Sequence, residues 1–378
     1  MIRTQQAHLP VVALSDPGMR GKNNEDRFGV VAMRTGEANA TPALLAVLAD
    51  GIGGHRAGEV AAEMAVNLIA AFVLENGDRL PPQELLEEAI TRASQSIYEQ
   101  AQTSRAKKGM GATCACVYIL GHQLYTASVG DSRIYLLRGG SIRQLTTDHT
   151  WIQEALERGL ITSEQVNGHP NSHVIRRFLG SPTPPQVDFR LRLNGEESDE
   201  QAAANQGLHL RDGDRLLLCS DGLTDLVSDE EILAAVENQP AQEAAAGLIA
   251  LANQRGGHDN ITLVLVEVPP GSLPQAGPKP ARRWWVWGCV ALLIVALLGG
   301  LLGGGALWLL NRAEPTPMAE PTRPASGTLQ AETLLPAVTI LPSPTPPLIS
   351  LTDEAGTLPV PLVDSPTPTP WPTYTLQP

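Results

Sequence analysis

Asp50 stands between an apolar run and a glycine-rich stretch, and this combination could bind a metal ion. Residues 43–49 are all apolar and predict a buried strand, and three of the four residues after Asp50 are glycines. A carboxylate at the end of a buried strand requires a cation or several hydrogen-bond donors. Glycines let the backbone pass close to a bound group. The segment therefore predicts a cation site at the end of this strand.

Further acids lie at the ends of predicted strands at 28–31, 125–130, 216–220 and 261–266. They are Glu25, Asp26, Asp131, Asp221 and Asp259. Because no His or Cys cluster accompanies them, these oxygen ligands favour a hard cation, Mg²⁺ or Mn²⁺. Several carboxylates around one point repel each other, so we expect two cations that share a bridging carboxylate. Such pairs support in-line displacement at phosphorus.

The composition argues against one class of function and indicates a compartment. The 378 residues carry a net charge of −13, which argues against a nucleic-acid-binding protein. A phosphate substrate stays compatible with this charge, because bound metals invert the local field. The four cysteines form no CxxC pair and predict reduced thiols in a cytosolic domain. Residues 1–10 lack the apolar core of a signal peptide.

Changes in composition divide the chain into four predicted regions. Residues 1–268 combine apolar strands with helical runs and predict a globular domain. Residues 269–283 form a linker rich in Pro and Gly. The uncharged residues 284–310 are long enough to cross a bilayer as one transmembrane helix. Residues 311–378 are rich in Pro and Thr and predict a disordered tail.

The flanks of the predicted transmembrane helix indicate its orientation. Tryptophans stand at both ends, as interfacial anchors do, and Lys279, Arg282 and Arg283 precede it. The positive-inside rule therefore places residues 1–283 in the cytoplasm and the tail outside the cell membrane. The GxxxG spacings within residues 299–305 either support dimerisation of this helix or merely suit a helix in a bilayer.

The strand and helix patterns predict an α+β fold. Residues 112–129 and 134–145 predict two antiparallel hairpins, and residues 57–74 and 82–106 predict helices with apolar faces. Antiparallel strands with flanking helices favour a layered sandwich over a parallel doubly wound sheet. The polar, acidic residues 194–207 predict a solvated surface insertion.

Seven short motifs follow one another along residues 8–268. They are Asn24-Glu25-Asp26, Asp50-Gly51-Ile52-Gly53-Gly54, Gly109-Met110-Gly111-Ala112-Thr113, Gly130-Asp131-Ser132-Arg133, Leu145-Thr146-Thr147-Asp148-His149, Ser220-Asp221-Gly222-Leu223 and Asp259-Asn260. In order and spacing, this region resembles the metal-dependent Ser/Thr protein phosphatases of the type 2C (PPM) family, particularly the bacterial branch. The resemblance implies a four-layer α-β-β-α sandwich of two antiparallel sheets with flanking helices. It also implies two Mn²⁺ or Mg²⁺ ions at one end, between the sheets.

The resemblance implies a role for each principal acid. Asp50 bridges both metals, and the carbonyl oxygen of Gly51 contributes to one of them. Asp221 and Asp259 complete the coordination of the other metal. Glu25 holds metal-bound water. These assignments make Asp50, Asp221, Asp259 and Glu25 the expected catalytic residues.

Other polar residues of the motifs have supporting or open roles. By the resemblance, Asp26 and Asn260 support the metal ligands. Asp131 either binds a weaker third metal together with Asp221 or is a turn acid with its hydrogen bonds satisfied. For Asp148 we expect the second role, that of a satisfied turn acid.

The implied reaction is hydrolysis of phosphoserine and phosphothreonine on proteins, by a water that two metals activate. No covalent phosphoenzyme is expected. At the membrane this activity would oppose cytosolic Ser/Thr kinases, with phosphorylated proteins as partners. Two other hypotheses stay open: an inactive phosphatase-like domain that binds phosphoproteins, and a protein whose tail, attached to the cell envelope, is its main functional part.

Two positions depart from the family pattern. Where many members carry a phosphate-binding Arg four residues before Glu25, this chain has Gly21. Arg20 could bind the substrate phosphate or be a surface cation, and Lys22 could replace it only as a point charge. Where eukaryotic relatives carry a His after Asp-Gly, this chain has Ile52, so we expect water to protonate the leaving oxygen.

Residues 150–193 resemble the bacterial flap, a segment that covers the site and affects substrate choice; we call them the flap. Residues 151–158 predict a short helix within it. Arg176 and Arg177 could contact the phosphoprotein substrate or only face solvent.

Overall fold

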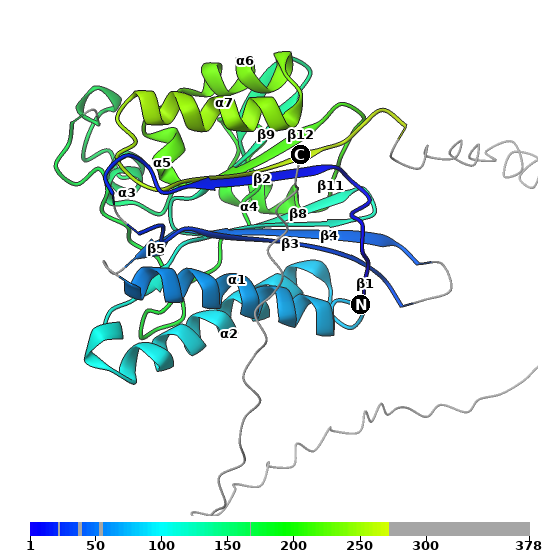
Figure 1. The fold of residues 1–378 in the computed structure, drawn as a ribbon, viewed down its shortest axis with the longest axis horizontal. Coiled ribbons are helices and arrows are strands. Elements are labelled where there is room, and N and C mark those ends of the chain that lie inside the picture. Colours follow the sequence, from blue (N-terminus) through cyan, green and yellow to red (C-terminus); the bar gives the residue numbers. More distant parts are fainter. Residues whose placement is uncertain (22, 37–39, 53–55, 167, 272–378) are drawn as a thin grey trace, which may run out of the picture. The chain divides into compact units, whose positions relative to one another are not determined.

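Two antiparallel sheets lie face to face in the computed structural model, which describes residues 1–21, 23–36, 40–52, 56–166 and 168–271 (Figure 1). The first sheet has the strand order β1-β3-β4-β7-β8-β11. Its strands are β1 (Ile2–Arg3), β3 (Arg27–Arg34), β4 (Pro42–Ala49), β7 (Cys114–Leu120), β8 (Gln123–Val129) and β11 (Leu208–His209). The predicted transmembrane helix, the tail and most of the linker lie outside the described residues.

The second sheet has the strand order β10-β9-β12-β13-β2. Its strands are β2 (Val11–Asp16), β9 (Arg133–Arg138), β10 (Ser141–Gln144), β12 (Arg215–Cys219) and β13 (Ile261–Glu267). A third, two-stranded sheet pairs β5 (Gly51–Ile52) with β6 (Gly111–Ala112). Strand β5 follows β4 along the chain, and β6 precedes β7.

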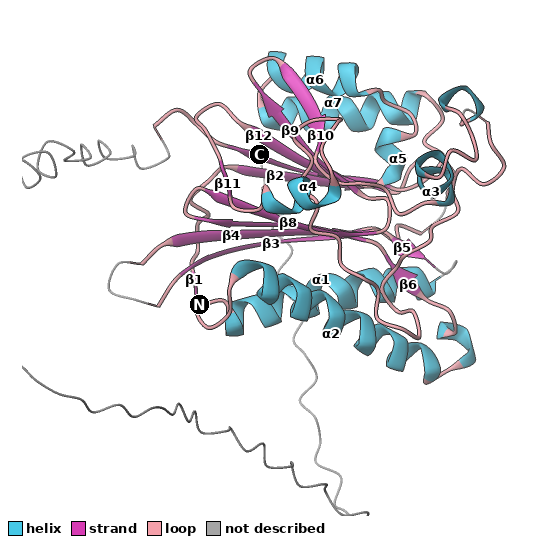
Figure 2. Ribbon diagram, turned by 180° about the vertical axis from the view of Figure 1, so that it is seen from behind, coloured by secondary structure: helices cyan, strands magenta, loops and turns pink. Residues whose placement is uncertain are grey.

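Helices cover the outer face of each large sheet (Figure 2). The helices are α1 (Arg56–Asn76), α2 (Pro82–Gln102), α3 (Trp151–Glu157), α4 (Asp199–Ala204), α5 (Asp221–Thr224), α6 (Asp229–Asn238) and α7 (Ala241–Gln254). Helices α1 and α2 share an apolar cluster with the first sheet, and α6 and α7 share one with the second. A third cluster fills the space between the sheets. The predicted α+β sandwich of two antiparallel sheets with flanking helices is confirmed.

The position of β4 in the middle of the first sheet explains why its sequence is apolar without alternation. Leu44 and Leu48 face the core between the sheets, whereas Leu45 and Val47 face the helices. All four side chains are fully buried. A strand that is covered on both faces has a continuous apolar sequence. This buried strand carries Asp50 at its end.

One stretch of helix among the described residues, Ala57–Asn76, has the length and mean hydropathy (1.6) needed to cross a membrane. Its Ala61, Ala65 and Ile69 are fully buried in the cluster beneath the first sheet. Packing inside the domain therefore accounts for the apolar face of α1.

The structure contains the elements expected from the sequence and several that were not expected. Both hairpins form, and α1, α2 and α3 lie where helices were expected, although α2 ends at Gln102 before a separate 3₁₀ turn. The insertion expected at 194–207 lies largely at the surface, and it contains α4, which the sequence reasoning did not predict. Ser198 and Gln201 cap α4 reciprocally, and Ala202 on that helix is buried. The sequence reasoning also did not identify β2, α6 and α7.

Candidate metal centre

Strand register brings the predicted acids to one end of the two sheets. Arg27 of β3 pairs with Ala49 of β4, so Asp26 and Asp50 extend from neighbouring strand ends. Cys219 of β12 pairs with Arg133 of β9, which brings the chain around Asp221 beside the chain around Asp131. Antiparallel pairing thus gathers residues that are far apart in sequence.

The negative charges of these acids act on one another. Burial and then the charges of the other four aspartates raise the pKa of Asp50 well above its usual value; the four are Asp26, Asp221, Asp131 and Asp259. Burial, with neighbouring charges that include Asp131, also raises the pKa of Asp221. Like charges shift a pKa in this way only at short range or in a poorly solvated site. The five predicted aspartates therefore form one cluster.

Two aspartates of the cluster are almost completely buried. Asp26 is 2% exposed and Asp131 is 7% exposed, and burial raises the pKa of each to about 6. Oδ1 of Asp26, of Asp131 and of Asp221 has no hydrogen-bond partner within the described part of the chain. Buried carboxylate oxygens without donors are costly unless a cation binds them. This donor set fits the hard divalent cations that the sequence predicted.

Thr113 joins the two strand ends that carry Asp50 and Asp131. The Asp50 backbone N–H donates to Thr113 Oγ1 at 2.9 Å, and the Thr113 N–H donates to the Asp50 carbonyl at 2.8 Å. Thr113 Oγ1 also lies 2.7 Å from Ser132 Oγ, one residue after Asp131. The fully buried Thr113 hydroxyl therefore fixes the spacing between these acids. The sequence reasoning included Thr113 and Ser132 in motifs but gave them no role.

Ser220 fixes the position of Asp26 by hydrogen bonds, as Thr113 does for Asp50. Its hydroxyl donates to Asp26 Oδ2 at 2.7 Å and accepts from the Thr262 backbone N–H at 3.0 Å. Because Thr262 is on β13, Ser220 ties Asp26 to the second sheet. In the sequence, only the position of Ser220 directly before Asp221 pointed to this contact.

Asn260 holds the segment that contains Glu25, and Gly58 leaves room for the Glu25 side chain beside Gly51. The Glu25 N–H donates to Asn260 Oδ1 at 2.8 Å. A Cβ placed on Gly58 would lie 2.7 Å from Glu25 Oε2 and 2.7 Å from the Gly51 carbonyl oxygen. Glycine at position 58 therefore lets the Glu25 carboxylate approach the Gly51 carbonyl. The Asn260 N–H also donates to Asp259 Oδ1 at 2.9 Å, so one amide residue contacts both predicted ligands.

His149 connects the base of the flap to the turn before Asp131. Its Nδ1 accepts from the Gly130 N–H at 3.0 Å, so its Nε2 carries the proton that is donated to Asp188 at 3.0 Å. The His149 carbonyl accepts from the N–H of Arg176 in the flap at 2.7 Å. Burial alone would raise the pKa of Asp188, but hydrogen bonds from His149 and from an arginine lower it well below its usual range.

The remaining predicted residues lie outside this hydrogen-bonded frame. Asp148 accepts from Arg133, with the shortest contact 2.7 Å, so its expected role as a satisfied turn acid is confirmed. Arg20 is exposed, and its Nη2 lies 3.2 Å from His258 Nδ1. Lys22 lies outside the described residues.

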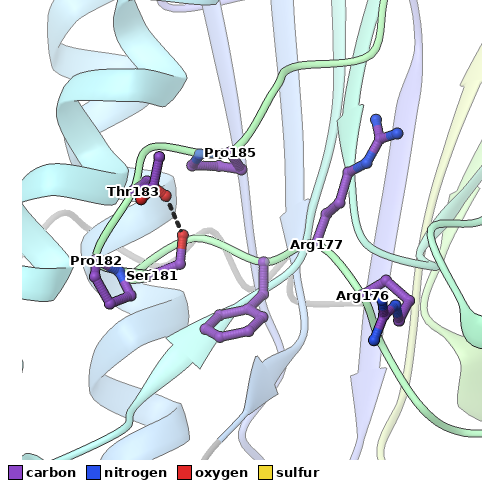
Figure 3. Close-up of a pocket in the computed structure, with 7 residues that line it drawn as sticks. Arg176, Arg177, Ser181, Pro182, Thr183 and Pro185 are labelled. Carbon is purple, nitrogen blue, oxygen red and sulfur yellow. Dashed lines mark hydrogen bonds between the residues drawn. The ribbon is translucent and has the colours of Figure 1, made fainter.

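The flap arginines line a hollow of about 330 Å³ (Figure 3). Its other lining residues are Phe178, Ser181, Pro182, Thr183 and Pro185. Arg176 forms an ion pair with Glu154 at 3.3 Å. Arg177 extends away from Ser181 and Thr183, and it has no ion-pair partner in the described part of the chain (Figure 3).

Comparison with known proteins agrees with this geometry. A family model described as "Protein phosphatase 2C" matches residues 19–254. The chain belongs to the protein phosphatase 2C family. This confirms the resemblance drawn from the seven motifs.

Several family members are similar over the whole described domain. Serine/threonine protein phosphatase PstP of Mycobacterium tuberculosis is 36% identical over 274 residues, which cover 71% of this chain and 47% of PstP. Protein phosphatase PhpP of Streptococcus pneumoniae is 35% identical over 263 residues, which cover 69% of this chain and 98% of PhpP. The match thus spans about half of PstP and nearly all of PhpP.

Solved structures of protein phosphatase 2C relatives share the fold. The S. agalactiae serine/threonine phosphatase is 33% identical with a TM-score of 0.58, and the match covers 69% of this chain and 99% of that one. The catalytic domain of PstP, solved in complex with two manganese ions, is 35% identical with a TM-score of 0.54. That match covers 69% of this chain and 98% of the PstP chain.

Replacing Asp26 with Asn tests the cost of the buried charge. Because burial raises the pKa of Asp26 from 3.8 to about 6, the wild-type protein without metal loses stability as the pH rises through about 6. At about pH 8 we expect the Asp26→Asn variant to be more stable by up to about 3 kcal/mol. Below about pH 4 the difference should vanish, since the carboxyl is protonated in both the folded and unfolded states. Urea unfolding with a chelator measures this, and Glu87→Gln, on an exposed part of α2, is the control. Equal stabilities at pH 8 would contradict the prediction.

Replacing Thr113 with Val removes the hydroxyl that joins two strand ends while keeping the side-chain shape. We expect Mn²⁺ affinity to fall by about 10–100-fold, as when a residue that supports metal ligands is lost. Titration calorimetry measures the affinity, and Thr113→Ser should restore most of it. Thr126→Val, a buried change elsewhere on β8, should leave Mn²⁺ binding unchanged. If both Val variants bind Mn²⁺ equally well, Thr113 does not position the site.

Proposed function

We propose that this chain hydrolyses phosphoserine and phosphothreonine in proteins with the help of two divalent cations, Mn²⁺ or Mg²⁺. The observation that carries the proposal is the aspartate cluster, in which Oδ1 of Asp26, of Asp131 and of Asp221 is buried without a hydrogen-bond donor among the described residues. Membership of the protein phosphatase 2C family supports it, as do the relatives named as serine/threonine phosphatases.

In this proposal each acid has the role that the family pattern implies. Asp50, the carbonyl oxygen of Gly51, Asp221 and Asp259 would hold the cations, with Asp50 contributing to both of them, and Glu25 would orient water. The contacts made by Asp26 and Asn260 favour a supporting role for both, since each is hydrogen-bonded to a neighbour of a ligand or to a ligand itself.

Water is the proposed nucleophile. When bound, two such cations lower the pKa of a water molecule and offset the charge on the attacking and leaving oxygens of the phosphate. The thiols of Cys114, Cys116 and Cys219 are fully buried, and burial raises the pKa of Cys114 and Cys219 to about 12. A buried thiol with a raised pKa is a poor nucleophile.

Two arginines are candidates for contacts with the phosphoprotein. Arg20 lies on the segment just before Glu25 and is exposed beside His258, so it can reach a phosphate at the site mouth. Arg177 lines the flap hollow without an ion-pair partner among the described residues and could pair with acidic residues of the substrate. Arg176 is already paired with Glu154, which makes it the weaker candidate.

Replacing Asp50 with Asn tests the proposed reaction. We expect the wild-type chain to release phosphate from phosphothreonine and phosphoserine peptides only with Mn²⁺ or Mg²⁺. The variant should lose roughly 10³-fold in kcat/KM, because the bridging charge is gone. A colorimetric phosphate assay measures this, with Glu87→Gln as the control.

Other results of that assay would change the conclusion. Hydrolysis that persists with a chelator would contradict the metal-dependent mechanism. Tight binding of a phosphopeptide without turnover would favour the inactive, phosphoprotein-binding alternative.

We further propose that residues 284–310 anchor the chain in the cell membrane as a single transmembrane helix. The support is in the sequence: an uncharged span, tryptophans at both ends and basic residues before it. The phosphatase domain, residues 1–268, would then be cytoplasmic and act against Ser/Thr kinases there, with the tail, residues 311–378, outside. The GxxxG spacings in the span are consistent with a helix dimer.

Cell fractionation tests the membrane anchor. We expect the full chain in the membrane fraction even after an alkaline carbonate wash, because a spanning helix is not held by charge. A chain that ends at residue 271 should be found in the soluble fraction with its phosphatase activity intact. Release of the full chain by carbonate would contradict a spanning helix.

A further inference from the structure

The rings of His122 and His209 lie against each other at the end of the first sheet that is opposite the aspartate cluster. His122 is in the turn between β7 and β8, and His209 is on β11, which pairs with β8. Leu120, just before this turn, pairs with Ala43 near the start of β4, whereas Asp50 follows the end of β4. The proposed reaction gives this pair of imidazoles no role.

The separation of the two rings is that of two ligands on one metal ion. A metal bound to an imidazole nitrogen at about 2.1 Å lies about 3.3 Å from the centre of the ring. At ligand angles of about 90–109°, the centres of two such rings are about 4.7–5.4 Å apart. The ring centroids of His122 and His209 are 5.1 Å apart, and the rings are tilted by 36°. The backbone therefore already holds the two imidazoles at the spacing that a shared cation needs.

His122 also has a ring nitrogen without a hydrogen bond. Its Nδ1 is buried and has no hydrogen-bond partner among the described residues. A buried polar atom without a partner is costly, and a neutral imidazole can bind a metal through either ring nitrogen. Because His209 is exposed, ions from solution can reach the pair. A cation shared by the two rings would use a nitrogen that contact between the rings alone leaves unsatisfied.

Two basic side chains beside this pair add little positive charge to it. Nη2 of Arg138 donates to the His209 carbonyl at 3.2 Å, but the same guanidinium donates to Asp214 at 2.7 and 2.6 Å, which offsets its charge. His8 reaches the same turn, where its Nε2 donates to the Gly121 carbonyl at 3.1 Å. Burial lowers the pKa of His8 and so favours its uncharged ring. The surroundings of the pair are therefore compatible with a cation.

We infer that His122 and His209 bind one divalent cation of the class that prefers imidazole, such as Zn²⁺, Ni²⁺ or Cu²⁺, and that this cation ties β11 to the turn between β7 and β8. Strand β11 is a two-residue strand at the edge of the first sheet, so such a tie would add to few ladder contacts. Mg²⁺ prefers oxygen ligands, and Mn²⁺ binds most weakly among the first-row dications. The inferred site thus differs from the proposed catalytic centre in position, ligands and metal, and it does not depend on the proposed function.

Pulsed electron paramagnetic resonance with Cu²⁺ as the probe counts the imidazoles that bind the metal. With Mg²⁺ in excess and less than one Cu²⁺ per full chain, we expect two imidazole nitrogens on Cu²⁺. His122→Gln and His209→Gln should each leave one. Each should also lower the Cu²⁺ affinity by about tenfold or more, because the fold makes binding of the second ligand intramolecular.

His169→Gln is the matched control, since His169 also packs against a ring, that of Trp151, with centroids 4.7 Å apart. It should keep both nitrogens and the Cu²⁺ affinity. The inference is overturned if the wild-type chain binds Cu²⁺ through fewer than two imidazoles, if His209→Gln keeps both, or if His169→Gln loses one. Circular dichroism checks that each variant folds, and the exposed His209 keeps the test decisive should His122→Gln misfold.

Thermal unfolding with Zn²⁺ as the probe provides a second measurement. A cation that binds only the folded chain raises the unfolding temperature, so we expect Zn²⁺ to raise the Tm of the full chain by several degrees with Mg²⁺ in excess. Most of this rise should be lost in His122→Gln and His209→Gln and kept in His169→Gln. Phosphopeptide hydrolysis with Mg²⁺ should be unchanged in His122→Gln and His209→Gln. An equal rise of Tm in the wild type and in both of these variants would show that no cation ties β11 to the turn.

Discussion

Repulsion among buried carboxylates is the constraint on which the rest of this structure depends. Asp50 and Asp221 each have a raised pKa because burial and several neighbouring negative charges act on them. A fold can keep such groups together only if its core contributes enough stability to offset the repulsion, or if cations bind. The three apolar clusters and the cations would therefore act together: the clusters hold the acids at short range, and the cations remove the repulsion.

The two-sheet frame suits this task because its strand ends are fixed from both sides. Leu45 on one face of β4 and Leu48 on the other are fully buried, so the strand that ends at Asp50 can neither slip nor rotate without exposing apolar surface. Hydroxyl groups then set the distances between strand ends. Thr113 connects two ends of the first sheet, and Ser220 connects Asp26 to β13.

The sequence predicted the sandwich because hairpins and helices with apolar faces leave local patterns, and it predicted the acids because apolar runs border them, as at Asp50 and Asp221. It could not predict register, and therefore could not show which hydroxyl binds which acid. The sequence reasoning did not predict α4 within the surface insertion at 194–207, because the helix cap at Ser198 was not weighed against the acidic composition.

The negative charge of the same acids would repel the proposed phosphoprotein substrate, so the proposal requires that substrate binding be coupled to metal binding. A phosphorylated protein brings more negative charge to a chain whose net charge is already −13. Without cations, the field at the aspartate cluster would repel a phosphate; with them, the local sign is inverted. Arg20, which is exposed, and Arg177, which is half-buried, could orient a phosphoprotein but would not offset the charge of the aspartate cluster. In the proposed reaction, substrate recognition would therefore depend on the same bound cations as hydrolysis.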